Sequence, residues 1–226
     1  MTKEKKIEIT SLPSDTSSEF NFKIVIIGEP GVGKSSIISR GVNNIFTNDY
    51  KTTLCFDHSW KNYKVNNSKI RIQLWDTCGQ EIYHSVIKNF YKSALCIFVV
   101  FAIDDIESFN SLNYWLNEIK EVCSEDTLVF LIGNKIDKEN ERKVSKEKIE
   151  VFINQNNILN YYETSAANGD NIDLLFEESV KELYIKNIIP LLNGFQSRNS
   201  SILTNTLDKS NLVTFQDNKG CKNCIC

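Results

Sequence analysis

A glycine-rich octapeptide that directly follows a short apolar run constrains the fold of this chain more than any other feature. Residues 28–35 read Gly-Glu-Pro-Gly-Val-Gly-Lys-Ser, a complete G-x-x-x-x-G-K-S phosphate loop. The preceding segment 22–27 is apolar and rich in β-branched residues, as a buried strand should be, and residues 35–42 are predicted to open a helix. A glycine-rich turn without a ligand would not explain this strand–loop–helix order. The sequence therefore predicts a phosphate site at the start of the helix.

The residues of this loop are suited to different parts of a nucleoside triphosphate. Glycines let the backbone N–H groups from about Gly31 to Ser35 turn inward, and the following helix adds its positive N-terminal end. Lys34 is expected to reach the β- and γ-phosphates, and the Ser35 hydroxyl to bind Mg²⁺. Pro30 has no N–H and therefore cannot donate from its position in the loop.

Three more motifs follow in order, and two of them are suited to reading guanine. They are Trp-Asp-Thr-Cys-Gly-Gln-Glu at 75–81, Asn-Lys-Ile-Asp at 134–137 and Glu-Thr-Ser-Ala at 163–166. Guanine offers two neighbouring N–H donors, which the carboxylate of Asp137 can accept together. Adenine offers no such pair and would leave the carboxylate unpaired at a cost of several kcal/mol. The aliphatic stem of Lys135 is expected to cover the plane of the base.

The four motifs together resemble those of the Ras superfamily of small GTPases over about residues 20–185. The resemblance implies that Asp76 holds Mg²⁺ through water, that the Gly79 N–H binds the γ-phosphate and that Gln80 orients the attacking water. It also implies that the Ala166 N–H meets the guanine O6. The alternative for Gln80 is an ordinary solvated surface glutamine.

The segment 46–53 resembles the first switch of this superfamily. Thr53 stands at the position of its Mg²⁺-binding threonine, Phe46 at that of the aromatic residue packed edge-on to the base, and Tyr50 at that of the aromatic residue covering the phosphates. For Phe46 a place in the hydrophobic core remains the alternative. The expected catalytic residue is Gln80, the expected Mg²⁺ ligands are Ser35, Thr53 and Asp76, and the expected nucleotide-binding residues are Gly28, Gly31, Val32, Gly33, Lys34, Ser35, Ser36, Phe46, Tyr50, Thr53, Gly79, Asn134, Lys135, Asp137, Ser165, Ala166 and Ala167.

Apolar runs that alternate with helical patterns predict an α/β fold. With the resemblance, we expect the phosphate-loop GTPase fold, a mainly parallel six-stranded sheet flanked by about five helices. In such folds ligands bind at the carboxyl ends of the strands, which is where all four motifs fall. Beyond the runs already named, strands are predicted at 56–65, 69–75, 94–101, 128–132 and 161–162, and helices around 109–119, 145–156 and 171–185.

The two ends of the chain differ in composition from its middle. Residues 1–19 are predicted to be a disordered extension, 20–185 to be the GTPase domain, and 186–226 to be a flexible tail rich in Asn, Ser, Thr and Lys. The longest apolar run, 94–103, has ten residues, fewer than the about 20 that a membrane span needs. A net charge of −3 argues against nucleic acid as a partner.

The tail ends in a Cys-x-Cys sequence, formed by Cys224 and Cys226. This ending is similar to that of doubly geranylgeranylated Rab proteins, and it favours the Rab branch of the superfamily. A metal site formed with Cys221 is the alternative, but the tail offers no fourth ligand nearby. The seven cysteines of the chain are not spaced as in a disulfide scaffold.

The leading hypothesis is a monomeric, Rab-like molecular switch that hydrolyses GTP slowly and acts in vesicle trafficking. The resemblance implies an exchange factor, a GTPase-activating protein (GAP), an escort protein or GDP-dissociation inhibitor, and effectors as partners. It also implies prenyl anchoring on the cytoplasmic side of intracellular membranes, with a soluble cytosolic pool. Three alternatives remain: a GTP-binding module whose catalysis has decayed, a Ras- or Rho-like signalling GTPase, and a phosphate-loop kinase or ATPase, against which the guanine motifs argue.

Overall fold

The computed structural model describes residues 7–48, 57–77 and 91–193. The chain divides into two compact units, Met1–Ile189 and Pro190–Cys226, and all the strands and helices named below lie in the first.

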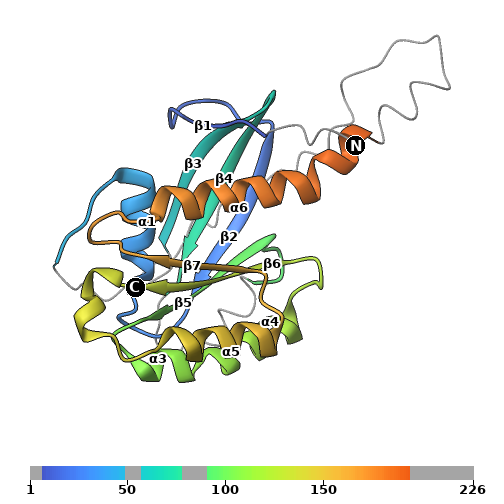
Figure 1. Ribbon diagram of the computed structural model, residues 1–226. Coiled ribbons are helices and arrows are strands. Elements are labelled where there is room, and N and C mark those ends of the chain that lie inside the picture. Colours follow the sequence, from blue (N-terminus) through green and yellow to red (C-terminus); the bar gives the residue numbers. More distant parts are fainter. Residues whose placement is uncertain (1–6, 49–56, 78–90, 194–226) are drawn as a thin grey trace, which may run out of the picture. The chain divides into compact units, whose positions relative to one another are not determined.

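A seven-stranded sheet forms the centre of the first unit, with the strand order β1-β3-β4-β2-β5-β6-β7 (Figure 1). The five strands from β4 to β7 in this order run parallel, whereas β3 is antiparallel to β4 and β1 is antiparallel to β3. This confirms the α/β fold with a mainly parallel sheet. The strands are β1 (Ile9–Leu12), β2 (Phe20–Ile27), β3 (Asp57–Val65), β4 (Ser68–Asp76), β5 (Cys96–Ala102), β6 (Leu128–Asn134) and β7 (Asn160–Thr164).

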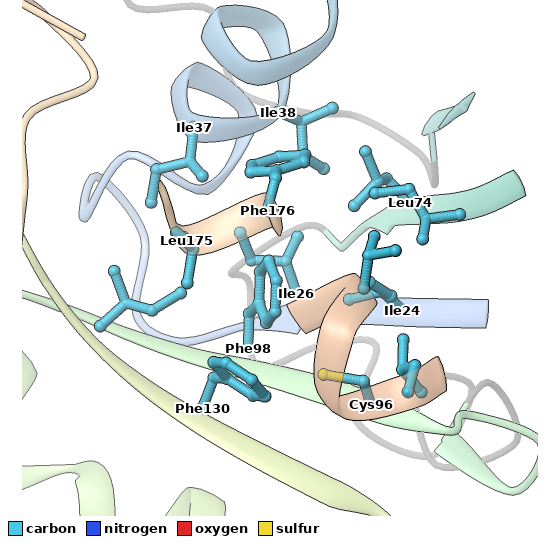
Figure 2. Close-up of a cluster of buried hydrophobic side chains, with 14 of the residues drawn as sticks. Ile24, Ile26, Ile37, Ile38, Leu74, Cys96, Phe98, Phe130, Leu175 and Phe176 are labelled. Carbon is cyan, nitrogen blue, oxygen red and sulfur yellow. The ribbon is translucent and has the colours of Figure 1, made fainter. Parts of the chain in front are cut away.

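Helices cover both faces of the sheet, because successive residues of its central strands point to opposite sides. Ile24 and Ile26 of β2 face one core, with α1 and α6, while Val25 and Ile27 face the other, with α3, α4 and α5. Figure 2 shows the first core, where Phe98 lies among side chains from β2, α1 and α6. The helices of the first unit include α1 (Lys34–Asn43), α3 (Ile106–Asn110), α4 (Leu112–Val122), α5 (Lys146–Asn156), α6 (Ile172–Asn187) and the short 3₁₀ helix η2 (Ile136–Glu141).

The sheet has seven strands rather than the expected six, because part of the N-terminal segment pairs with its edge. Ile9–Leu12 forms β1 in antiparallel register with β3, so the prediction of disorder throughout 1–19 was wrong for these residues. The segment that follows is fixed by Asn62, whose Nδ2 donates to the carbonyls of Pro13, Ser14 and Thr16 at 2.9–3.2 Å. A four-residue strand with mixed polarity is stable only beside such a partner, and its own composition therefore does not reveal it.

Candidate nucleotide-binding site

Four sequence motifs meet at one edge of the sheet, where parallel strands end side by side. The phosphate loop follows β2, and Asp76 ends the neighbouring strand β4, opposite Ile26. Asn134 ends β6 and is paired in register with Thr164 at the end of β7. The prediction that the motifs converge on one edge is therefore confirmed for their described residues.

The phosphate loop wraps around the side chain of its own lysine. Lys34 is only 6% exposed, and its Nζ donates to the carbonyl oxygens of Gly28 and Glu29, each at 2.8 Å. The loop leads directly into α1, whose first residue is Lys34. The positive end of this helix and the ammonium group of Lys34 therefore lie at the same place, as an anionic ligand requires.

Gly33 fits its place in the loop because it lacks a side chain. Its φ of +99° lies in the left-handed region, and a Cβ added to it would lie 2.3 Å from Nδ2 of Asn134. The glycine thus lets the phosphate loop approach the motif that is expected to read the base.

Ser35 and Asp76 bring two oxygen ligands together. The Ser35 hydroxyl donates a hydrogen bond to Oδ2 of Asp76, a carboxylate that is only 4% exposed. The next residue, Thr77, donates from Oγ1 to the Ile26 carbonyl at 2.8 Å and fastens the end of β4 to β2. A hydroxyl and a carboxylate are the hard oxygen ligands that Mg²⁺ prefers, so this pair fits the ion that the sequence predicts.

Asn134 joins the phosphate loop to the loop after β7. Its side chain is 1% exposed, and Nδ2 donates to the Val32 carbonyl at 2.8 Å. Its Oδ1 accepts hydrogen bonds from the Ala166 N–H and the Thr164 hydroxyl, both at 3.2 Å. One buried amide at the end of β6 therefore ties the phosphate loop to the loop after β7 through three hydrogen bonds, a role that the motif alone did not predict.

Asp137 is exposed at the start of η2, and its carboxylate is oriented by a neighbouring hydroxyl. Ser165 donates from Oγ to Oδ1 of Asp137 at 2.5 Å, and Ser165 Oγ itself accepts the N–H of Asn168 at 3.0 Å. A carboxylate can accept about four hydrogen bonds, so Asp137 keeps the capacity to accept two more from a ligand.

Lys135 is positioned by an acidic residue that the motifs did not indicate. Its Nζ lies 3.5 Å from Oδ1 of Asp104, and Lys138 lies 2.9 Å from Oδ2 of the same carboxylate. Burial alone would raise the pKa of the Asp104 carboxyl, but the hydrogen bond from Lys138 and the charge of Lys135 outweigh burial, and the pKa lies below its usual value. Asp104 is therefore ionised at neutral pH and holds both lysines.

Arg40 is a second residue that sequence reasoning missed. From the last turn of α1 it donates from Nε to the Ala166 carbonyl at 2.9 Å and from Nη2 to the Ala167 carbonyl at 2.6 Å. Its guanidinium also lies 5.9 Å from the centre of the Phe46 ring, and Phe46 packs against the first core. The only signal in the sequence is a basic residue near a helix C-terminus, which predicts helix capping rather than support of a distant loop.

A comparison with protein families decides what kind of protein carries this site. The model of the Ras family matches residues 23–185. The chain belongs to the Ras family. Within the family it is a Rab-like small GTPase, an enzyme that binds and hydrolyses GTP.

The similar proteins include Rab proteins from distant organisms. The chain is 36% identical over 173 residues to the Ras-related protein Rab-11C of Dictyostelium discoideum, covering 76% of this chain and 77% of the relative. It is 37% identical over 158 residues to Homo sapiens Rab-30, covering 70% and 77% of the two chains. It is 34% identical over 166 residues to the GTP-binding protein ypt3 of Schizosaccharomyces pombe, covering 74% and 77%.

Several residues expected of a Ras-family site lie outside the described residues, and their roles stay predictions. The expected residues outside the described segments 7–48, 57–77 and 91–193 are Tyr50, Thr53, Gly79 and Gln80 of the nucleotide site and the two tail cysteines, Cys224 and Cys226.

Among the helices of these described segments, none has the length and apolar character that crossing a bilayer demands.

Proposed function

We propose that this chain is a Rab-type switch that binds GTP or GDP with Mg²⁺ and acts in vesicle trafficking on intracellular membranes. The observation that carries the proposal is Asn134, which joins the phosphate loop at Val32 to the base loop at Ala166. In a nucleotide bound across both loops, the phosphate loop contacts the phosphates and the base loop contacts the base. The buried side chain of Asn134 holds these two loops together. The two ends of the ligand are therefore recognised by one connected site.

The phosphate end is bound by Lys34 and by the backbone N–H groups at the start of α1. Two loop carbonyls hold the ammonium group of Lys34 inside the loop, where the triphosphate is expected. Ser35 and Asp76 would hold Mg²⁺, with Thr53 as a further ligand. The ion supplies positive charge that neutralises the phosphate oxygens.

The base end is read by Asp137, which accepts the N1–H and N2–H donors of guanine. The hydrogen bond from Ser165 fixes the carboxylate before the base arrives, so less ordering remains to be done on binding. The Ala166 N–H, which lies 3.2 Å from Asn134 Oδ1, would share its proton with the guanine O6. Asp104 holds Lys135 so that its stem covers the ring. Phe46, whose ring centre lies 5.9 Å from the Arg40 guanidinium, is assigned the place edge-on to the base.

Hydrolysis and switching are assigned to the segments around Thr53 and Gly79. Gln80 orients the attacking water, and the Gly79 N–H and Thr53 hold the γ-phosphate and its Mg²⁺, so both segments are released when the γ-phosphate leaves. Since none of the four motifs contains an arginine, the intrinsic rate is expected to be slow, on the order of 10⁻⁴ to 10⁻³ s⁻¹, until a GAP supplies one.

The membrane anchor is assigned to prenyl groups on Cys224 and Cys226. One chain gives marginal membrane binding and two give stable anchoring, which is why both cysteines are needed. An escort protein or GDP-dissociation inhibitor would carry the prenylated chain through the cytosol, and an exchange factor and effectors would act on it at the membrane.

Single-turnover hydrolysis of GTP tests this function. The purified protein is loaded with GTP, and phosphate release is followed with and without Mg²⁺, beside a Gln80→Leu variant. We expect slow phosphate release in the wild type that requires Mg²⁺, still slower release in the variant, and nearly equal nucleotide affinity in both. A wild type that retains GTP but releases no phosphate would support the decayed binding module instead.

A further inference from the structure

The phosphate loop carries a negative side chain that is bound by a helix on the opposite face of the sheet. Oε1 of Glu29 accepts a hydrogen bond from the indole Nε1 of Trp115 at 3.1 Å. Trp115 lies on α4, is 3% exposed and belongs to the second core. The helix that starts at the phosphate loop, α1, packs into the first core through Ile37 and Ile38.

A carboxylate in this loop is an electrostatic problem for a phosphate-binding protein. A unit negative charge near a triphosphate repels it, and the repulsion is strong in a partly buried site because screening is weak there. The Glu29 side chain is half-buried, and its own backbone carbonyl accepts a hydrogen bond from Lys34. The position of the Glu29 carboxylate relative to the phosphates therefore matters for nucleotide binding.

We propose that Trp115 is a positioning residue for nucleotide retention, which holds the Glu29 carboxylate on the α4 side and away from the bound phosphates. The indole N–H is a neutral donor, so it restrains the carboxylate without adding a charge that would compete with Lys34. The interaction also satisfies the buried indole N–H, which needs a partner in the core. This inference rests on the proposed function, because it concerns retention of a guanine nucleotide.

Two substitutions remove the hydrogen bond but have opposite consequences for the charge. Trp115→Phe removes the donor and leaves the carboxylate free to approach the phosphates, whereas Glu29→Ala removes the carboxylate itself. A purely structural role for the pair would make both variants release nucleotide faster. If the pair restrains the charge, only Trp115→Phe releases nucleotide faster than the wild type. The double variant, which carries Glu29→Ala as well, then releases nucleotide slowly again.

The experiment measures the rate at which bound GDP labelled with a fluorescent group leaves the full-length protein, with excess unlabelled GDP and Mg²⁺. Trp60→Phe, the same substitution at a tryptophan on β3 that is 43% exposed, is the matched control. We expect about tenfold faster release in Trp115→Phe at low salt, the size expected for one hydrogen bond to a charged group. Glu29→Ala, the double variant and the control should stay within about twofold of the wild type.

The outcomes separate this inference from the proposed function. A wild type that does not retain GDP overturns both. A wild type that retains GDP, with Trp115→Phe releasing it at the same rate, overturns the role of Trp115 alone. Glu29→Ala leaves the core side chain in place and keeps the inference open to refutation even if Trp115→Phe does not fold. Fast release from Glu29→Ala would show that the hydrogen bond itself supports the loop, and it would overturn the inference.

Discussion

Replacement of Asn134 by alanine is the most informative change to the fold of the site. The substitution removes a buried amide that makes three hydrogen bonds, and it leaves the Val32 carbonyl, the Thr164 hydroxyl and the Ala166 N–H without that partner. All three contacts lie in the interior of the protein, where water does not readily replace the lost amide.

The expected loss of stability follows from these three contacts. A buried polar group left unsatisfied costs about 1–3 kcal/mol. Taking the lower end for each group, because the Thr164 hydroxyl can rotate to a new partner, gives a loss of about 3 kcal/mol in the free energy of unfolding. That is a large share of the 5–15 kcal/mol typical of a folded domain.

The measurement is urea unfolding followed by far-ultraviolet circular dichroism, at several GDP concentrations with Mg²⁺. The dependence on GDP separates intrinsic stability from stabilisation by the ligand. Thr164→Val is the matched control, since it removes one hydroxyl of the same cluster, and it should lose about 1 kcal/mol. The double variant should be less destabilised than the sum of the two single variants, because Asn134→Ala has already left that hydroxyl without its amide partner.

A variant Asn134→Ala whose unfolding free energy stays within about 0.5 kcal/mol of the wild type, a typical effect of a neutral surface substitution, would refute this reasoning. Strict additivity in the double variant would likewise show that Asn134 and Thr164 do not act on each other.

Three further predictions concern the phosphate site, the base loop and the tail. Ser35→Asn should weaken Mg²⁺ and GTP binding more than GDP binding, because the hydroxyl ligand is lost, and equal dissociation constants for the two nucleotides would contradict this role. Arg40→Gln should weaken GDP binding about tenfold, because Arg40 supports the loop carbonyls of Ala166 and Ala167. The loss should be smaller for a 2-aminopurine nucleotide, which lacks O6. Equal losses for the two nucleotides in a competition assay would argue against an effect of Arg40 through the loop that contacts O6. Replacing both Cys224 and Cys226 by serine should move the protein to the cytosol in cell fractionation, and a double variant that stays on membranes would place the anchor elsewhere.

Much of the fold could be predicted because the phosphate loop and the Asn134 motif each adjoin a strongly apolar strand. Segments such as 128–132 and 22–27 are buried on both faces and therefore read as continuous apolar runs, and they appear in the structure as β6 and β2. Asn66, in the turn between β3 and β4, has a positive φ of 52°, which asparagine tolerates. Strand β1 was not predictable, because its stability comes from pairing with β3 rather than from its own residues.

The individual ligand-facing residues were easier to predict than the residues that support them. The roles of Lys34 and Asp137 follow from the chemistry of phosphates and guanine, which any sequence with these motifs must satisfy. Arg40, Asp104 and Trp115 act through tertiary contacts. Their partners, Ala166, Lys135 and Glu29, are 126, 31 and 86 positions away in the sequence. No local pattern encodes such contacts, so only the folded arrangement reveals them.

Base selectivity tests the central claim most directly, because it depends on the arrangement of Asp137 at the edge of the sheet. The measurement is a competition between GDP, ADP and xanthosine diphosphate for the wild type and for Asp137→Asn, in which an amide replaces the accepting carboxylate. We expect the wild type to select GDP, and the variant to lose GDP affinity and gain xanthosine diphosphate affinity, a change of several kcal/mol in relative binding. Unchanged GDP affinity in the variant, or equal binding of ADP and GDP by the wild type, would contradict the assignment of this site to guanine.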